Sequence, residues 1–153
     1  MKAKRPLKKV VFLFLVMLAV TGHTEARRSK RSVDQLTTMI ACATKNKWMH
    51  YMSYGCYCGP GGQGEPVDEV DRCCQRHDRC YQQVMYSMKC WLSLEVYFLS
   101  YGVTGCNYCK PSNSPCALEI CKCDSTLSKC LKNKPIQKRY ELYDQTKCSP
   151  NFI

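Results

Sequence analysis

Apolar residues recur at steps of three and four in three stretches of the chain, which is the spacing of one face of a helix. The first stretch, 32–44, opens on Ser32, an N-cap residue type, and has Asp34 in its first turn. Its apolar stripe consists of Val33, Leu36, Met39, Ile40 and Ala43. The sequence therefore predicts a helix over 32–44 that buries part of this stripe.

Two longer helical stretches follow. The second begins near Asp68, where Glu69 and Asp71 suit the positive end of a helix dipole. One face of it carries Cys73, His77, Cys80, Tyr81 and Val84. The third follows a turn at 110–115, and its face carries Cys116, Ile120, Cys123, Leu127, Cys130 and Leu131. The pattern thus predicts a mainly α fold with two long helices.

Between the two long helices, aromatic and β-branched residues beside glycines favour a short pair of strands. These residues are Tyr97, Phe98, Leu99, Tyr101, Gly102, Val103 and Gly105. A small two-stranded β wing is therefore expected next to the helices.

An apolar run of eleven residues, 10–20, follows a cluster of lysines and one arginine at the start of the chain. At ~1.5 Å per residue this run is too short to cross a bilayer as a helix, but it is typical of a signal peptide. We expect a signal peptide within 1–26, with cleavage after Gly22 or Ala26. A buried core helix is the alternative, and the basic flank counts against it.

The sequence Arg28-Ser29-Lys30-Arg31 resembles a furin-type processing site, so we expect 27–31 to be a basic propeptide and 32–153 the mature domain. A solvated basic linker is the alternative. Removing 1–31 takes away nine basic residues and one acidic residue, which lowers the formal net charge from +11 to +3. The charge of the mature domain therefore gives no reason to expect a nucleic-acid partner.

Fourteen cysteines in 153 residues, an even number, indicate a disulfide-rich extracellular protein. A zinc protein is the alternative, but oxidised cysteines cannot ligate zinc. Cys73 and Cys80 are seven residues apart, as are Cys123 and Cys130, so each pair lies on one helix face. Two antiparallel helices can thus be joined by Cys73–Cys130 and Cys80–Cys123, although sequence alone does not fix the connectivity.

The stretch 54–81, YGCYCGPGGQGEPVDEVDRCCQRHDRCY, runs from a glycine-rich loop into the second helix. Glycines at this density let the backbone turn tightly and expose its carbonyls. His77 and Asp78 are adjacent and project about 100° apart on a helix. The combination suggests a hard cation beside a proton acceptor.

This stretch resembles the calcium loop and catalytic helix of the secreted phospholipase A2 family. It meets the family pattern YGCYCGxGGxGxPxDxxDxCCxxHDxCY at every fixed position, and the resemblance extends over most of 32–148. It implies four further bridges, Cys56–Cys148, Cys58–Cys74, Cys90–Cys116 and Cys109–Cys121, which leaves Cys42 and Cys106. Cys106 and Cys109 lie closer together than in the family, so the wing is expected to be shortened. Whether Tyr97 or Tyr101 joins the family's buried hydrogen-bond network stays open.

The resemblance implies Ca²⁺ as the cofactor, held by the carboxylate of Asp78 and the backbone carbonyls of Tyr57, Gly59 and Gly61. A purely structural turn is the alternative for such a loop.

The resemblance also implies that His77 is the general base for water and that Asp124 orients its imidazole, with Tyr81 anchoring Asp124. Asp124 follows Cys123 and would approach His77 if Cys80 and Cys123 are bonded. The oxyanion would be held by calcium and the Gly59 amide.

In the family the first helix lines the channel for the acyl chain, which implies substrate contacts for Val33, Leu36 and Ile40. Trp48 and Met49 lie between lysines and are expected to contact the surface of a phospholipid membrane or aggregate. A place for Trp48 in the core is the alternative.

The sequence thus predicts a secreted, calcium-dependent phospholipase A2 that hydrolyses the sn-2 ester of glycerophospholipids to lysophospholipid and fatty acid. A receptor-binding or toxin-like protein on the same scaffold, with incidental catalysis, is the alternative, and the intact Asp78 speaks against it. A cysteine-rich structural or growth-factor module would not need His77, Asp78 and Asp124 beside a glycine loop.

Overall fold

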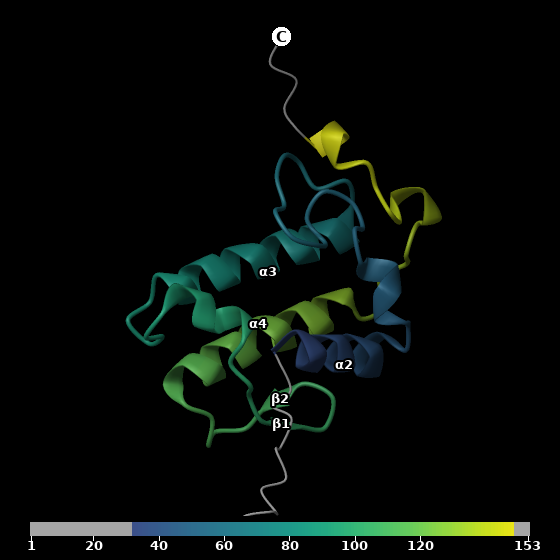
Figure 1. Ribbon diagram of the computed structural model, residues 1–153. Helices are drawn as coiled ribbons and strands as arrows, with labels where there is room; N and C mark the ends of the chain where they lie inside the picture. The colour runs from purple at the N-terminus through teal and green to yellow at the C-terminus, as the bar shows by residue number, and fades with distance from the viewer. Residues whose placement is uncertain (1–31, 149–153) are drawn as a thin grey trace, which may run out of the picture.

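The structure is a computed structural model that describes residues 32–148; the expected signal peptide and propeptide lie outside the described residues. Its main elements are α2 (Ser32–Thr44), α3 (Glu69–Met85) and α4 (Pro115–Leu131), with one small sheet. Figure 1 shows α3 and α4 running side by side, with α2 on the other side of α4 and the glycine-rich loop at one end of α3. The predicted fold class, mainly helical and disulfide-rich with a short wing, is confirmed.

Both long helices begin at side-chain caps. The Asp68 side chain accepts a hydrogen bond from the Asp71 amide (2.9 Å), which satisfies one of the free N–H groups of the first turn of α3. Ser114 caps α4 by accepting from the Ala117 amide (3.4 Å), and Pro115 occupies the first helical position, where its missing N–H costs nothing. The start of α3 is thus fixed directly after the glycine-rich loop.

Seven disulfides hold the described chain together, and no cysteine within residues 32–148 is free. Cys73–Cys130 and Cys80–Cys123 join α3 to α4 two turns apart, so the two helices run antiparallel as predicted. The four bridges implied by the family resemblance are also present, and the two remaining cysteines pair as Cys42–Cys106. Each bridge contributes roughly 2–4 kcal/mol to a domain whose core is small.

The wing differs from the expectation at its first half. The strands are β1 (Val103–Thr104) and β2 (Tyr108–Cys109), paired antiparallel. The predicted strand residues 97–99 instead follow or end a 3₁₀ turn, η2 (Ser93–Tyr97). The prediction was wrong there because the Glu95 backbone carbonyl accepts from the Phe98 amide (3.0 Å) and the Leu99 amide (2.9 Å), which folds the chain into a turn.

The buried residues form two clusters, one along the first half of α4 and one along its second half. One surrounds Ile120 and Cys121 and includes Tyr81 of α3, while the other surrounds Tyr54 and Val70 near the glycine-rich loop. The two clusters fix α2 and α3 against α4 and so determine what faces the space between them. Among residues 32–148, no helix is long and apolar enough to cross a membrane.

Candidate active site

A histidine–carboxylate pair joins the two long helices. His77 Nε2 of α3 lies 2.7 Å from Asp124 Oδ1 of α4, and the Asp124 side chain is fully buried. The Cys80–Cys123 bridge brings the two helices together beside this pair. An ionised carboxylate can only accept, so Nε2 carries the proton and Nδ1 keeps a free lone pair. His77 can therefore accept a second proton at Nδ1.

Two tyrosines complete the shell of Asp124. The Tyr81 hydroxyl donates to Oδ1 (2.9 Å) and the Tyr101 hydroxyl donates to Oδ2. Burial and the adjacent Asp124 carboxylate raise the pKa of Tyr101, so this hydroxyl remains a donor. The question left open by the sequence is thus answered: Tyr101 joins the network, while Tyr97 packs its ring on Tyr81 at 5.8 Å between centroids. Together with His77 Nε2, the two tyrosines give the Asp124 carboxylate three hydrogen-bond donors, which hold it in place.

Asp78 lies next to His77 but faces the glycine-rich loop. Within residues 32–148 its carboxylate has no hydrogen bond and no ion pair. Burial raises its pKa to about 6, the neighbouring His77 lowers it in part, and Asp71 adds to the rise. A Cβ on Gly62 would lie 2.7 Å from Asp78 Oδ2, so only glycine lets the loop pass this close. The backbone of the glycine-rich loop therefore removes the Asp78 carboxylate in part from water.

This arrangement passes a test for a hard cation. A half-buried carboxylate without a partner faces a loop whose available donors are carbonyl oxygens, and calcium prefers oxygen ligands. Tyr57, Gly59, Gly61 and Asp78, the residues expected to hold calcium, all line one cavity. The residues present thus fit calcium.

One expected feature of this loop is arranged differently. The Gly59 amide, which the resemblance assigns to the oxyanion, donates to the Tyr57 carbonyl at 2.9 Å. A carbonyl oxygen has a second lone pair, so Tyr57 can still contribute a ligand. In this structure the Gly59 N–H is therefore engaged within the loop.

Asp71 supports the loop from inside, and the sequence analysis missed this role. Its buried carboxylate accepts from the amides of Cys56 (2.8 Å), Tyr57 (2.7 Å) and Val67 (2.9 Å). A Cβ on Gly55, whose φ is +59°, would overlap this carboxylate. The signal was present, since Asp71 is a fixed position of the family pattern, but its place in a first helical turn suggested only a dipole effect.

A second supporting residue that was missed is Gln35 of α2. Its side-chain amide donates to the Tyr101 carbonyl and accepts from the Tyr101 amide at 3.0 Å. No motif marks a glutamine for this role, because the partner is a backbone segment 66 residues away.

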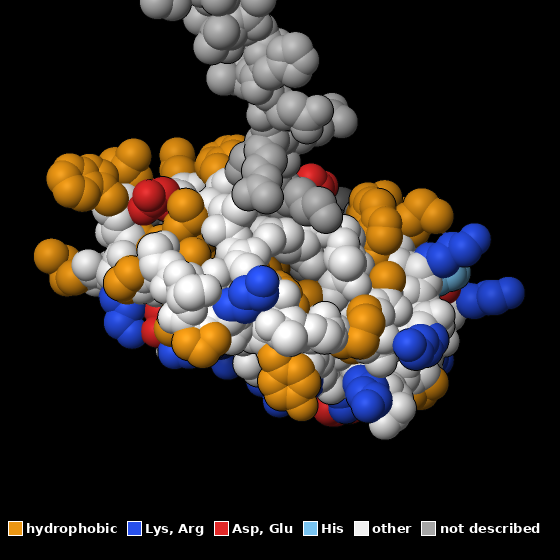
Figure 2. Space-filling model, turned by 90° about the horizontal axis from the view of Figure 1, so that it is seen from below, with side chains coloured by type: hydrophobic (Ala, Val, Ile, Leu, Met, Phe, Trp, Pro, Cys, Tyr) orange, Lys and Arg blue, Asp and Glu red, His pale blue; other side chains and the backbone are white. Residues whose placement is uncertain are grey.

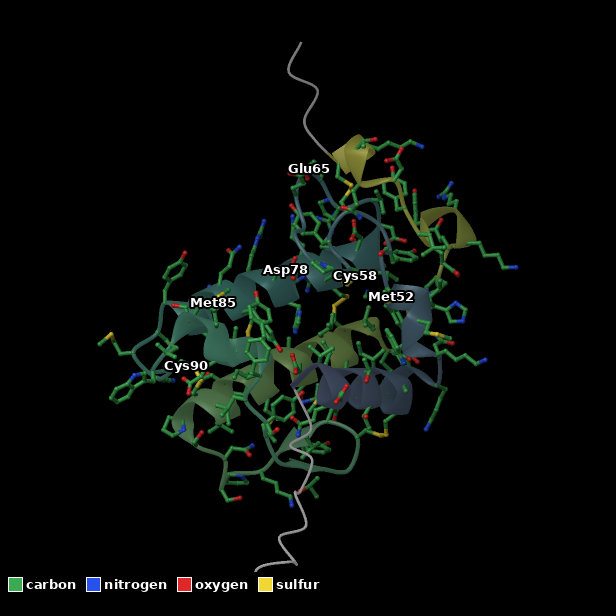
Figure 3. The ribbon with its side chains drawn as sticks, viewed as in Figure 1. Met52, Cys58, Glu65, Asp78, Met85 and Cys90 are labelled. Atoms are coloured by element: carbon green, nitrogen blue, oxygen red, sulfur yellow. A yellow bond between two sulfur atoms is a disulfide. The ribbon has the colours of Figure 1, made fainter. Side chains whose placement is uncertain are left out.

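A cavity of about 860 Å³ lies between α2, α3 and the loop, within the usual size of a small-molecule site. Val33, Leu36 and Ile40 line it, together with His77 and Asp78. Figure 3 labels four of its lining residues, Met52, Cys58, Asp78 and Met85. The cavity has the apolar wall that an acyl chain requires and a polar end with His77 and Asp78.

Trp48 and Met49 fall in η1 (Trp48–Tyr51) and are both exposed, so Trp48 is not a core residue. Trp48 lines the cavity and Met49 does not. Asp124 and Tyr101 lie behind the cavity wall, where they contact His77 or its partner rather than the open space.

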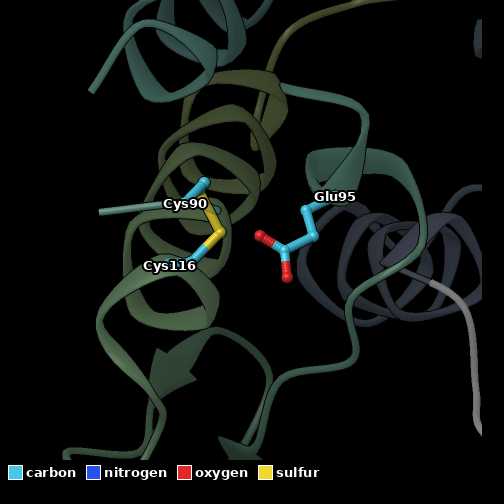
Figure 4. Close-up of side chains that lie close together, drawn as sticks. All are labelled: Cys90, Glu95 and Cys116. Atoms are coloured by element: carbon cyan, nitrogen blue, oxygen red, sulfur yellow. A yellow bond between two sulfur atoms is a disulfide. The ribbon is translucent and has the colours of Figure 1, made fainter. Parts of the chain in front are cut away.

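Cys90, Glu95 and Cys116 also place three potential metal-binding atoms within 4.8 Å of one another in the described chain (Figure 4). The two sulfurs are bonded to each other, which removes both as ligands. The Glu95 carboxylate is occupied by the amides of Trp91 and Leu92. This group is structural.

Comparison with known proteins agrees with this geometry. The family model described as phospholipase A2 matches residues 33–141. A protein of Calliactis polypus named phospholipase A2 is 41% identical over 141 residues, which cover 90% of this chain and 87% of that protein. Basic phospholipase A2 nigroxin A of Micrurus nigrocinctus is 41% identical over 114 residues, covering 74% of this chain and 95% of its own. Nigroxin B of the same species is 41% identical over 110 residues, covering 71% and 92%.

Proposed function

The chain belongs to the phospholipase A2 family and is an enzyme of that class, and from this premise we propose that it is a secreted, calcium-dependent hydrolase of the sn-2 ester of glycerophospholipids. The observation that carries the proposal is the His77–Asp124 pair at 2.7 Å, in which His77 lies beside Asp78 at the polar end of one apolar cavity and Asp124 lies behind the cavity wall. The products are a lysophospholipid and a fatty acid.

His77 acts as the general base. Its Nδ1 takes a proton from a water molecule while the water oxygen attacks the sn-2 carbonyl carbon. The imidazolium is stabilised through Nε2–H by Asp124, which Tyr81 and Tyr101 hold in place. When the ester C–O bond breaks, the same proton passes from His77 to the oxygen of the departing lysophospholipid. Water is the nucleophile, so no serine or cysteine nucleophile is needed.

Calcium would be held by the Asp78 carboxylate and the carbonyls of Tyr57, Gly59 and Gly61, and it would supply positive charge for the carbonyl oxygen of the substrate. Asp71 keeps the loop in the shape that presents these carbonyls. The cavity wall at Val33, Leu36 and Ile40 would contact the acyl chain and exclude water from it.

Substrates of this kind are held in membranes or aggregates. Trp48 and Met49 are exposed beside Lys45 and Lys47, and Trp48 also lines the cavity, which suits a contact between the cavity mouth and a lipid surface. Secretion is supported by the amino-terminal sequence pattern and by seven disulfides, which persist in oxidising compartments.

The test is release of fatty acid from phospholipid vesicles that carry a label in the sn-2 chain, with calcium and with excess chelator. We expect release only with calcium, and only from the sn-2 position. His77→Gln should lower the rate by about 10²–10⁴-fold, the usual contribution of a general base. His50→Gln is the matched control, because the His50 side chain is exposed and, within residues 32–148, its hydrogen-bond partner is Glu141, away from His77. Full release in chelator, or full activity of His77→Gln, would refute the proposal.

A further inference from the structure

Large apolar side chains are gathered on the segment that follows α3. We name this segment, residues 86–98, the apolar tip. Within it, Met88 is 100% exposed and Trp91 is 91% exposed. Tyr86, Leu92, Leu94 and Phe98 are exposed as well. Figure 1 shows this part of the chain at the end of α3, projecting beyond the helices. Single exposed apolar residues need no explanation, but a contiguous group of this kind marks an interaction surface.

The apolar tip is held in this exposed form by its own contacts. Cys90 is bonded to Cys116 of α4, and the Glu95 carboxylate accepts from the Trp91 amide (2.8 Å) and the Leu92 amide (3.3 Å) (Figure 4). Val96, which belongs to the same segment, is fully buried and anchors it to the core. The backbone of the apolar tip is therefore fixed while its large side chains are exposed. The backbone thus loses little conformational entropy when these side chains contact a partner.

The charged side chains of the apolar tip are already paired within the protein. It holds one lysine and one glutamate. Lys89 forms an ion pair with Glu119 of α4 at 2.8 Å, and Glu95 is engaged by backbone amides. Neither charge is available to pair with an acidic or basic partner, which favours a surface without net charge.

The apolar tip is also continuous with the cavity. Met85 precedes it and lines the cavity, and Tyr97 within it lines the cavity while its neighbour Phe98 is exposed. At the other end of the same cavity lie Trp48 and Met52. Figure 2 shows hydrophobic side chains gathered at both ends of the upper edge of the molecule in that view. A flat lipid surface can touch both ends at once.

We infer that the apolar tip docks on a bilayer of zwitterionic phospholipid, with Trp91 and Leu92 entering the boundary between headgroups and acyl chains. Tryptophan, phenylalanine and leucine are the side chains that favour this boundary. Because both charges of the tip are satisfied internally, docking needs no anionic lipid. The inference rests on the proposed function, since it names the lipid surface at which that site works.

The chain has two tryptophans, which allows each end of the cavity to be observed separately. Trp48→Phe leaves Trp91 as the only indole, and Trp91→Phe leaves Trp48. Vesicles of dialkyl-ether phosphatidylcholine carry no ester and so cannot be hydrolysed. On adding them, we expect the emission of Trp91 to shift to the blue and to become shielded from acrylamide. An unchanged Trp91 spectrum, while the protein sediments with the vesicles, would show that another surface docks.

A binding measurement tests the contribution of the apolar tip. Trp91→Ala should weaken sedimentation with these vesicles about tenfold, because one large apolar side chain no longer leaves water. Leu142→Ala is the control, since Leu142 is also exposed but lies outside the tip, and it should bind like the unaltered protein. Equal binding of Trp91→Ala would overturn the inference. So would a Trp91-dependent dimer in sedimentation equilibrium with no effect on lipid binding, which would assign the surface to a second copy.

Hydrolysis of a soluble monomeric ester separates this inference from the proposed function. Trp91→Ala should keep this activity, because Trp91 does not line the cavity. If the unaltered protein fails to hydrolyse any ester, the proposed function is wrong. If it hydrolyses the soluble ester and Trp91→Ala binds vesicles normally, only the inference is wrong.

Discussion

The side-chain amide of Gln35 pairs with both backbone groups of Tyr101, although the two residues are 66 positions apart. Tyr101 in turn donates its hydroxyl to Asp124, the carboxylate bound to His77. The first helix, α2, is thereby tied to the group that positions the histidine.

We expect Gln35→Leu to lower turnover through this connection. The substitution removes two hydrogen bonds, each worth about 0.5–1.5 kcal/mol, and leaves the Tyr101 backbone groups without their partner. If Gln35 only stabilises the fold, the free energy of unfolding falls and kcat on a soluble ester stays unchanged. If it positions Tyr101, kcat falls about tenfold at a temperature where the protein is fully folded. Gln83→Leu, at an exposed position of α3, is the control.

Asp78 makes the metal-free protein sensitive to pH. Its pKa is raised from an ordinary 3.8 to about 6 by burial, so the folded state disfavours the carboxylate. The sign follows: without calcium, Asp78 does not lower the stability below pH 3.8, lowers it progressively as the pH rises through this interval, and lowers it by a constant amount above about 6. Asp78→Asn should remove this fall in a chelator-treated sample. An identical pH profile for Asp78→Asn and the unaltered protein would contradict it.

The affinity for calcium should depend on the protonation state of Asp78. Below pH about 6 protons compete with the cation, and the apparent affinity falls up to tenfold per pH unit. Isothermal titration across this range measures the effect. Asp34→Asn, at an exposed carboxylate of α2, serves as the control and should keep the affinity and pH dependence of the unaltered protein.

Asp71→Asn should distort the calcium loop without touching a ligand directly. The carboxylate accepts from three backbone amides, whereas an asparagine offers one oxygen and turns an NH₂ group towards an N–H. At least one buried amide loses its partner at a cost of about 1–3 kcal/mol. We expect a lower melting temperature and at least tenfold weaker calcium binding. Unchanged calcium affinity would show that the loop keeps its shape without these bonds.

Processing before Ser32 should activate the protein. α2 begins at Ser32, and Val33 already lines the cavity, so a basic extension would join directly to the helix that Gln35 anchors. Mass spectrometry of the secreted protein should find Ser32 at the amino terminus, and Arg28→Ala/Arg31→Ala should yield a longer, weakly active form. Lys132→Ala/Lys134→Ala, directly after α4, controls for the loss of two charges. Equal activity of the long and short forms would refute an inhibitory extension.

The sequence predicted the helices well because their signals are local. The observed α2 spans the predicted range, and α3 begins directly after the residue expected to open it. The disulfide pairing was also within reach, because spacing on two helix faces and a specific family pattern point to the same partners.

What the sequence did not reveal depends on contacts between distant segments. Gln35 has no local signal for its role, and the pattern that contains Asp71 does not say what its carboxylate binds, because the groups that both residues hold are backbone atoms brought to them by folding. The error at residues 97–99 has the same origin. Strand propensity favoured an extended chain, whereas the Phe98 and Leu99 amides donate to the Glu95 backbone carbonyl and form a turn.

The arrangement of the bridges has a consequence for survival among extracellular proteases. A trypsin-like cut after the exposed Lys89 would divide the domain between α3 and η2. The two pieces would remain covalently joined by four bridges, Cys42–Cys106, Cys56–Cys148, Cys73–Cys130 and Cys80–Cys123. His77 and Asp124 would then lie on separate polypeptides and still be clamped against each other. A nicked molecule would run as one band on a non-reducing gel and as two after reduction, with the His77–Asp124 pair intact until a reductant separates the two pieces.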